Sequence, residues 1–138
     1  DLNNNRGLFA GSGADNTSGL VFGGDDPGST RFTETWNGTN WTEVNDLNAV
    51  QQTHGGMGTA TAALSFGGSP PTGATEEWNG TNWTEINDMN VGRAYPSGGG
   101  TTTAGLAFGG SNPSKTASTE EWSGTGFVIK TLTTTSDT

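Results

Sequence analysis

The sequence contains no cysteine, which excludes disulfide bonds and thiolate chemistry. Basic residues are also scarce: five lysines and arginines stand against 14 aspartates and glutamates, and the net charge is −9. Nucleic-acid binding depends on clustered cations that contact the phosphate backbone, and therefore this composition argues against it. No apolar run approaches the roughly 18 residues that a membrane-spanning helix needs. These absences remove several broad classes of function.

Large aliphatic side chains are scarce too. Leu, Ile, Val and Phe together number 20 of 138 residues, a composition that approaches that of disordered chains. However, the five tryptophans and 24 glycines recur at fixed places, which a disordered chain has no reason to maintain. We therefore expect one modest folded domain. Abundant Thr, Asn and Gly without cysteine favour an extracellular or virion surface as its location.

The recurring residues belong to an internal repeat. TETWNGTNWTEVNDLN (33–48) and TEEWNGTNWTEINDMN (75–90) are identical at 13 of 16 positions and are offset by 42 residues, and a decayed copy, TEEWSGTGFVIK, begins at Thr119. Further columns are formed by DLN, DLN and DMN at residues 1, 46 and 88. The glycine and tryptophan columns are Gly23, Gly24, Gly67, Gly68, Gly109 and Gly110, and Trp36, Trp78 and Trp122. A period of this length predicts a repeat architecture.

Each repeat reads as four short strands without a helical period. The first is rich in glycine (11–17, 55–61, 98–104), the second is an apolar run ending in Phe-Gly-Gly, the third is T-E-x-W, and the fourth begins at Trp41, Trp83 or Phe127. Asn37-Gly38 and Asn79-Gly80 predict a tight turn between the third and fourth strands, since both residue types tolerate positive φ. Four antiparallel strands per repeat predict an all-β propeller with blades at about 1–48, 49–90 and 91–138.

These features resemble the repeat of the kelch family of β-propellers. HGGMGTATAALSFGG, TEEW and NWTEINDMNVGR give, in order, a small-residue first strand, a double glycine, an aromatic third strand and a tryptophan that opens the fourth. Two departures are Trp in the third strand, where kelch repeats more often carry Tyr, and Phe127 in the last repeat. We interpret the final FVIKTLTTTSDT as a terminal strand that closes the array.

Three blades are fewer than the 4–8 of a usual propeller. Either two chains join head to tail into a ring of six blades, or a longer parent chain supplies further blades. Asp1 stands where the outer strand of a preceding blade should have just ended, which favours the longer parent.

The paired aromatics admit two interpretations. Trp36, Trp41, Trp78, Trp83 and Trp122 form either a carbohydrate platform or, as we prefer, packing between blades. Asn16, Asn37, Asn40, Asn79 and Asn82 fit the glycosylation pattern, but four of the five belong to the repeated hairpin, so turn chemistry is the favoured explanation.

Little in the sequence predicts an enzyme or a cofactor. Glu76-Glu77 and Glu120-Glu121 are neighbours on a strand and point to opposite faces, which suits solvated blade edges better than a paired catalytic site. Asp25-Asp26 alone is a weak calcium signal. His54 is the one histidine, and no zinc-ligand cluster is present. Some kelch-like propellers are copper oxidases with a cysteine-modified tyrosine, but a chain without cysteine cannot carry that group. We therefore expect no metal and no cofactor.

The divergent loops are the favoured location for a binding site. The loops between the second and third strands (25–32, 69–74, 111–118) and the stretches between blades should emerge on one face, where scaffolds commonly carry recognition. The candidate ligand-binding residues are Arg6, Phe9, Arg31, Gln51, His54, Arg93, Tyr95 and Lys115. We expect a non-enzymatic module that recognises a receptor protein or a glycan. In style the blades are similar to propeller arrays of environmental phage structural and tail proteins. The alternatives are a self-assembling virion or appendage component and, below it, a polysaccharide-active enzyme.

Overall fold

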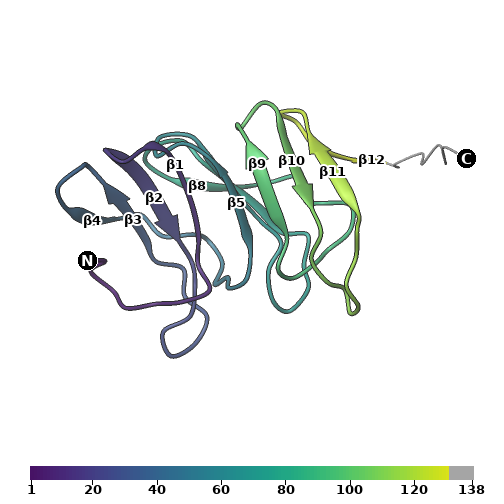
Figure 1. Ribbon diagram of the computed structural model, residues 1–138, viewed down its shortest axis with the longest axis horizontal. Coiled ribbons are helices and arrows are strands. Elements are labelled where there is room, and N and C mark those ends of the chain that lie inside the picture. The colour runs from purple at the N-terminus through teal and green to yellow at the C-terminus, as the bar shows by residue number, and fades with distance from the viewer. Residues whose placement is uncertain (131–138) are drawn as a thin grey trace, which may run out of the picture.

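The computed structural model describes residues 1–130, which form strands joined by loops. Twelve β-strands make three antiparallel sheets of four strands each, and the sheets stand side by side in chain order (Figure 1). Residues 1–130 contain no helix, and so none long and apolar enough to cross a membrane. The predicted all-β architecture of four-stranded propeller blades is confirmed.

The strands of each blade follow the chain from one edge of the sheet to the other. Blade 1 comprises β1 (Ala10–Asp15), β2 (Ser18–Phe22), β3 (Thr33–Trp36) and β4 (Trp41–Val44). Blade 2 comprises β5 (Gly55–Gly58), β6 (Ala63–Phe66), β7 (Thr75–Trp78) and β8 (Trp83–Ile86). Blade 3 comprises β9 (Ser97–Gly100), β10 (Gly105–Phe108), β11 (Thr119–Trp122) and β12 (Phe127–Lys130). Residues 131–138, most of the predicted terminal strand, lie outside the described residues.

The third and fourth strands begin where the sequence predicts, whereas the first strands of blades 2 and 3 are shorter than the predicted stretches. Gly58 and Gly100 take positive φ (106° and 119°), a conformation that glycine adopts at no steric cost, and the chain turns there. The Phe-Gly-Gly ends of the second strands behave similarly, because both glycines in each have positive φ and leave the sheet.

The hairpins between the third and fourth strands pair aromatic residues across the sheet: Trp36 with Trp41, Trp78 with Trp83, and Trp122 with Phe127. The turn lies where the Asn-Gly dipeptide predicts it, and Gly38 alone of the Asn37-Gly38 pair takes positive φ (91°). Asn37 instead caps the turn, because its Oδ1 accepts hydrogen bonds from the N–H groups of Thr39 and Asn40, both at 2.9 Å.

The first strands β1, β5 and β9 lie against one another from blade to blade. Their small residues are required by this crowding. A Cβ added to Gly98 would lie 2.5 Å from the ring of Phe66 in the preceding blade and 2.7 Å from the Leu106 carbonyl oxygen. The small residues of the first strands therefore have a direct steric basis here.

The apolar core lies between the blades. We call the side of a blade that faces the preceding blade its leading face, and the opposite side its trailing face. One cluster joins the trailing face of blade 1 to the leading face of blade 2, and the other does the same for blades 2 and 3. Trp83 of blade 2 packs on Phe22 of blade 1 with ring centroids 4.8 Å apart, and its Nε1 donates to Thr33 Oγ1 at 3.0 Å. Trp78, Trp83 and Trp122 therefore lie in the boundaries between blades, whereas Trp36 and Trp41 are half-buried on the leading face of blade 1.

Candidate functional site

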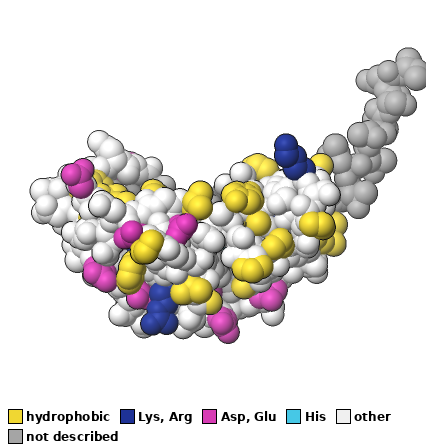
Figure 2. All heavy atoms as spheres, turned by 90° about the horizontal axis from the view of Figure 1, so that it is seen from below, with side chains coloured by type: hydrophobic (Ala, Val, Ile, Leu, Met, Phe, Trp, Pro, Cys, Tyr) yellow, Lys and Arg dark blue, Asp and Glu magenta, His cyan; other side chains and the backbone are white. Residues whose placement is uncertain are grey.

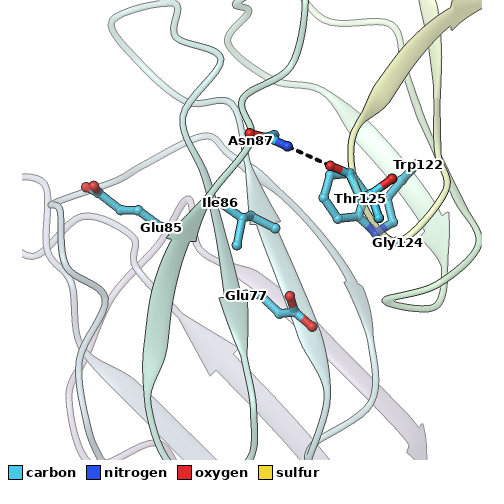
Figure 3. A pocket seen from close by; sticks show the side chains of 7 residues that line it. All are labelled: Glu77, Glu85, Ile86, Asn87, Trp122, Gly124 and Thr125. Atoms are coloured by element: carbon cyan, nitrogen blue, oxygen red, sulfur yellow. Dashed lines mark hydrogen bonds between the residues drawn. The ribbon is translucent and has the colours of Figure 1, made fainter.

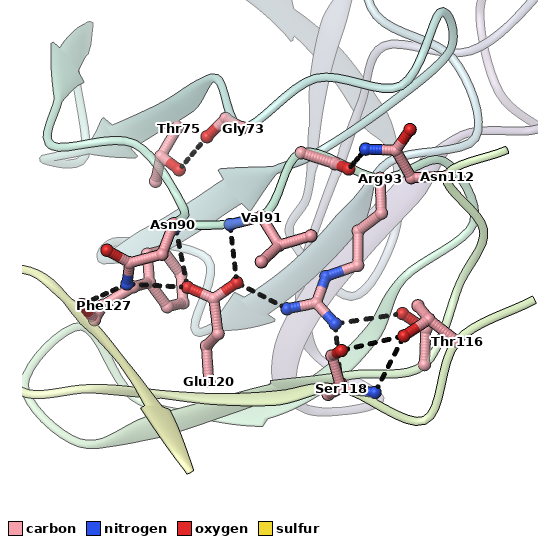
Figure 4. A network of polar contacts seen from close by, with 12 residues as sticks. Gly73, Thr75, Asn90, Val91, Arg93, Asn112, Thr116, Ser118, Glu120 and Phe127 are labelled. Carbon is pink, nitrogen blue, oxygen red and sulfur yellow. Dashed lines mark hydrogen bonds and ion pairs between the residues drawn. The ribbon is translucent and has the colours of Figure 1, made fainter. Parts of the chain in front are cut away.

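The linkers that lead into the blades are each anchored on a buried carboxylate. Glu34, Glu76 and Glu120 occupy the second position of the third strands and are fully or almost fully buried. In blade 3 the Glu120 carboxylate accepts from the Asn90 N–H at 2.8 Å, the Asn90 side-chain amide at 3.0 Å and the Val91 N–H at 3.1 Å (Figure 4). Asn48 and Asn3 likewise donate their N–H groups to Glu76 and Glu34, both at 2.8 Å.

An arginine completes this anchor in two of the three blades. Arg93 Nη2 donates to Glu120 Oε1 at 2.6 Å, and its Nη1 donates to the Ser118 carbonyl at 2.6 Å (Figure 4). Arg6 pairs with Glu34 at 3.0 Å, and the side chains of both residues are closed to solvent. Burial lowers the pKa of Arg6, while Glu34 opposes that shift. These groups therefore hold the linker to the blade.

In blade 2 the linker is anchored without an arginine. Gln51 occupies the arginine position, and its Oε1 accepts from Ser65 Oγ at 2.8 Å. The residues that correspond to Ser65 are Val21 and Ala107, which pair with the carboxylate residues in the other blades. Among the described residues Glu76 has no ion-pair partner, and Gln51 Nε2 has no hydrogen-bond partner.

The burial of two of these carboxylates contradicts a prediction made from the sequence. Glu76 and Glu120 were predicted to be solvated blade edges, but both are buried, because the leading face of a strand is covered by the linker and the neighbouring blade. Glu77 is half-buried and Glu121 is exposed, so the prediction that adjacent glutamates point to opposite sides agrees with the structure.

The side chains of four of the eight candidate ligand-binding residues are also buried, which contradicts the prediction that they lie on an open loop surface. Arg6 and Arg93 are held in ion pairs, and Gln51 is bound to Ser65. His54 lies beside the Phe22 ring, with its Nε2 3.1 Å from the Phe22 carbonyl oxygen. Burial lowers the pKa of His54 to about 4, so the imidazole is neutral at pH 7.

The other four candidates, Phe9, Arg31, Tyr95 and Lys115, are exposed. They lie among the loops between second and third strands and the linkers, which pair with one another. Thr30 bridges to Gln51 and Ala94 bridges to Ser111. We call the surface formed by loops 25–32, 69–74 and 111–118 with these linkers the loop face.

Tyr95 and Lys115 are brought together on the loop face. With Gly110, Ser111 and Pro113 they line an open hollow of about 530 Å³. The Tyr95 side chain is strongly exposed (62%). Arg31 lines a separate hollow of about 470 Å³ with residues 26–30, Phe32 and Val50. Arg31 on one side and Tyr95 with Lys115 on the other therefore line two separate hollows rather than one cleft, and Phe9 lines neither.

Tyr95 belongs to a structural column that the sequence did not reveal. Leu8, Thr53 and Tyr95 hold equivalent positions before the first strands, and all three take positive φ (54°, 55° and 56°). Non-glycine residues rarely adopt this conformation. Successive members are hydrogen-bonded, since Thr53 N–H donates to the Leu8 carbonyl at 2.9 Å and Tyr95 N–H donates to the Thr53 carbonyl at 2.7 Å. The backbone conformation that exposes Tyr95 is thus fixed by its neighbour in the preceding blade.

A further groove lies on the outer side of the boundary between blades 2 and 3 (Figure 3). It has a volume of about 610 Å³, and its walls include Glu77, Ile86 and the hairpin at Gly124 and Thr125. Asn87 Nδ2 donates to the Thr125 carbonyl at 2.7 Å and bridges the two blades. Trp122 is almost fully buried at its base, so the groove offers no open aromatic surface on which a sugar could stack.

Other predicted signals have local explanations. Asn79 Oδ1 caps its hairpin by accepting from the N–H groups of Thr81 and Asn82, as Asn37 does in blade 1. Asp25 belongs to backbone bridges with Gly7 and Ser29. Within residues 1–130 there is no cluster of three or more His, Asp or Glu side chains arranged to hold a metal ion.

Comparison with known proteins shows the fold and nothing finer. No protein-family model matches the sequence, and no curated protein matches it. A solved structure entitled "Structure of YjhT" is similar to the chain with a TM-score of 0.73 and 11% sequence identity. The similarity covers 91% of this chain and 46% of that one, so the chain spans less than half of the length of this structural neighbour.

Proposed function

We propose that the chain is a non-enzymatic recognition module built from kelch-like propeller blades, and that it acts at an exterior surface such as a virion or a cell envelope. The observation that carries the proposal is the pairing of exposed Tyr95 with Lys115 on the loop face. The surrounding framework repeats almost unchanged, while the loops that line this hollow differ between blades. A rigid scaffold with variable loops is a common design for binding.

The kelch-like assignment rests on how the repeated residues are used. Small first strands admit the aromatic rings of the preceding blade, the double glycines turn the chain at positive φ, and the paired aromatics wedge between blades. These are the roles that the resemblance to the kelch repeat implies.

A glycan is the ligand class that best suits the hollow. A tyrosine ring offers an apolar face for stacking and a hydroxyl at its edge, while lysine donates hydrogen bonds to hydroxyl or carboxylate oxygens. Ser111 adds a further polar group to the lining. A receptor protein is the other ligand class, and the test below distinguishes it from a glycan.

The test is binding of the purified chain to a glycan array and to host cells. We expect Tyr95→Ala with Lys115→Ala to weaken binding roughly tenfold or more, as removal of an aromatic anchor usually does. Lys130→Ala is the matched control, because it removes an exposed cation from β12, away from the hollow. Cell binding without glycan binding would favour a protein receptor. Unchanged binding by the double variant would contradict the proposed site.

An architectural role is the second candidate. The observation that favours it is the exposed apolar surface at the end of the array, where Leu106, Phe108 and Val128 face solvent. Regular self-assembly by a chain that binds neither cells nor glycans would support this function over recognition.

A further inference from the structure

The trailing face of blade 3 is an uncovered copy of a surface that is buried elsewhere in the same chain. Leu106 and Phe108 are 43% and 44% exposed, whereas their equivalents in blade 2, Leu64 and Phe66, are fully buried against blade 3. Figure 2 shows apolar side chains at the surface toward the end of the molecule where blade 3 lies. This surface is thus an interblade face without its partner blade.

The leading face of blade 1 is also uncovered, and it is the opposite type of interblade face. Trp36 and Trp41 pack on each other with ring centroids 5.5 Å apart but remain half-buried. Their equivalents in blade 2, Trp78 and Trp83, are buried against blade 1. The two uncovered faces stand at opposite ends of the row of sheets (Figure 1), so they cannot cover one another within one chain.

The internal boundaries show which groups would meet if these faces joined. Between blades 1 and 2, Phe22 packs on Trp83, and Thr33 Oγ1 accepts from Trp83 Nε1. Phe108 and Thr119 hold the positions of Phe22 and Thr33 on the free trailing face, and Trp41 holds the position of Trp83 on the free leading face. Each group at one end therefore has its counterpart at the other.

We propose that the trailing face of blade 3 in one copy of the chain docks on the leading face of blade 1 in a second copy, and that two copies close a ring of six blades. The contact is continuous with the two interblade boundaries inside the chain and repeats their chemistry. One copy has three blades and three copies would have nine, so two copies alone give a number within the usual range of about 4–8. A head-to-tail contact made twice around a twofold axis closes without forming a filament.

Closure would also continue the backbone contacts near the axis. Leu8, Thr53 and Tyr95 are linked by hydrogen bonds from each N–H to the preceding carbonyl. In the ring, the Leu8 N–H of one copy would meet the Tyr95 carbonyl of the other. This second set of contacts makes the register of the proposed interface specific.

Molar mass measured by light scattering gives the first test. We expect the wild-type chain to have about twice its 14.1 kDa mass, and Leu106→Asp with Phe108→Asp to halve the observed value. Both substituted residues are exposed in a single copy, so the variant should retain its fold, which circular dichroism checks. Val50→Asp is the control, since Val50 is an exposed apolar residue of the loop face, and it should leave the mass unchanged. A folded wild-type monomer at all concentrations, or an open-ended polymer, would overturn the ring.

Cysteine cross-linking tests the orientation, and the natural chain has no cysteine to interfere. Inside the chain Met57 contacts Gly105, and their equivalents at the free ends are Gly99 and Gly19. Neither Gly99 nor Gly19 has positive φ, and a Cβ at either meets no atom closer than 3.6 Å.

We expect a mixture of Gly19→Cys and Gly99→Cys chains to form a covalent dimer on oxidation, while neither variant alone does. Dimerisation of a single variant with itself would show that like faces pair, which contradicts the head-to-tail contact. Absence of any cross-link in a mixture that retains the dimer mass would likewise contradict it.

Discussion

At the residue scale, the anchor of each linker depends on buried charge. Arg93 and Glu120 are both fully buried, and breaking such a pair by removing one partner typically costs about 3–5 kcal/mol, since a buried charge is left uncompensated. We therefore expect Arg93→Gln to lower the free energy of unfolding by about this amount, as measured by denaturant unfolding at a fixed protein concentration. Arg31→Gln is the control. Its pair with Asp46 is partly exposed and the two atoms are 3.9 Å apart, so its loss should be almost neutral.

The arrangement in blade 2 offers a rescue of that variant. There Gln51 occupies the arginine position and is bound by Ser65, whose equivalent in blade 3 is Ala107. Adding Ala107→Ser to Arg93→Gln should recover part of the lost stability, because the glutamine then gains the hydrogen bond seen in blade 2. No recovery would mean that the serine does not compensate for the missing arginine.

His54 should make stability depend on pH. Its folded-state pKa of about 4 lies below the ordinary 6.5, because burial opposes the charged ring. The unfolded chain therefore binds more protons between these values, so stability is complete above pH 6.5 and falls as the pH drops toward 4. The loss approaches about 3 kcal/mol, from 1.36 kcal/mol per pKa unit. His54→Gln should flatten this part of the pH profile. Since it removes the one histidine, an unchanged profile would contradict the assignment.

The sequence predicted the roles of some residues and missed those of others for a physical reason. Trp83 and the double glycines were assigned correctly, because size and backbone conformation restrict where they fit. Glu120 was assigned to a solvated strand edge, and Arg93 to an exposed stretch between blades, since polar residues at such positions usually face water. In a propeller both faces of an internal blade are covered, so strand alternation does not separate core from solvent. The repeated pairing of T-E with D-x-N in all three repeats was the available signal.

At the element scale, the glycine-rich first strands set how closely the blades approach. Gly98 and Gly99 are neighbours on β9 but point to opposite faces. A Cβ on Gly98 would press into the Phe66 ring, whereas a Cβ on Gly99 would meet nothing within 4 Å. We expect Gly98→Ala to destabilise the fold by about 1–3 kcal/mol, as overpacking does, and Gly99→Ala to be neutral or slightly stabilising. Equal effects of the two substitutions in thermal unfolding would contradict the described packing.

Strand positions were predictable because their boundaries carry strong local signals. The T-E-x-W strands begin at Thr33, Thr75 and Thr119, as the repeat indicates. The first strands were predicted too long, since Thr and Ala tolerate extended backbone and conceal the turn that glycine makes. Nothing in the sequence indicates the left-handed conformation of Thr53. A β-branched residue is disfavoured in that conformation, and contacts with the neighbouring blades hold it there.

At the scale of the whole molecule, stability resides in the boundaries between blades. A single four-stranded sheet has two faces to bury, and each internal boundary buries one face of each of its two blades. An array of three blades has two internal boundaries and therefore leaves two faces uncovered. The cost of losing an interblade side chain should then depend on whether its boundary lies within one chain or between two copies.

Trp78 and Trp36 form a matched pair for this comparison. Each donates its Nε1 proton to a carbonyl oxygen of its own blade, Ala60 at 3.1 Å and Asn16 at 2.9 Å, so they differ chiefly in what covers the ring. Trp78→Ala should cost about 3–5 kcal/mol at any protein concentration, because its boundary is internal. Trp36→Ala should cost much less in dilute solution and more as the concentration rises, because within one chain the ring is only half-buried and the proposed second copy would cover the rest. Thermal unfolding across a dilution series measures both. A concentration-independent cost for Trp36→Ala would mean that no second copy rests on the leading face of blade 1.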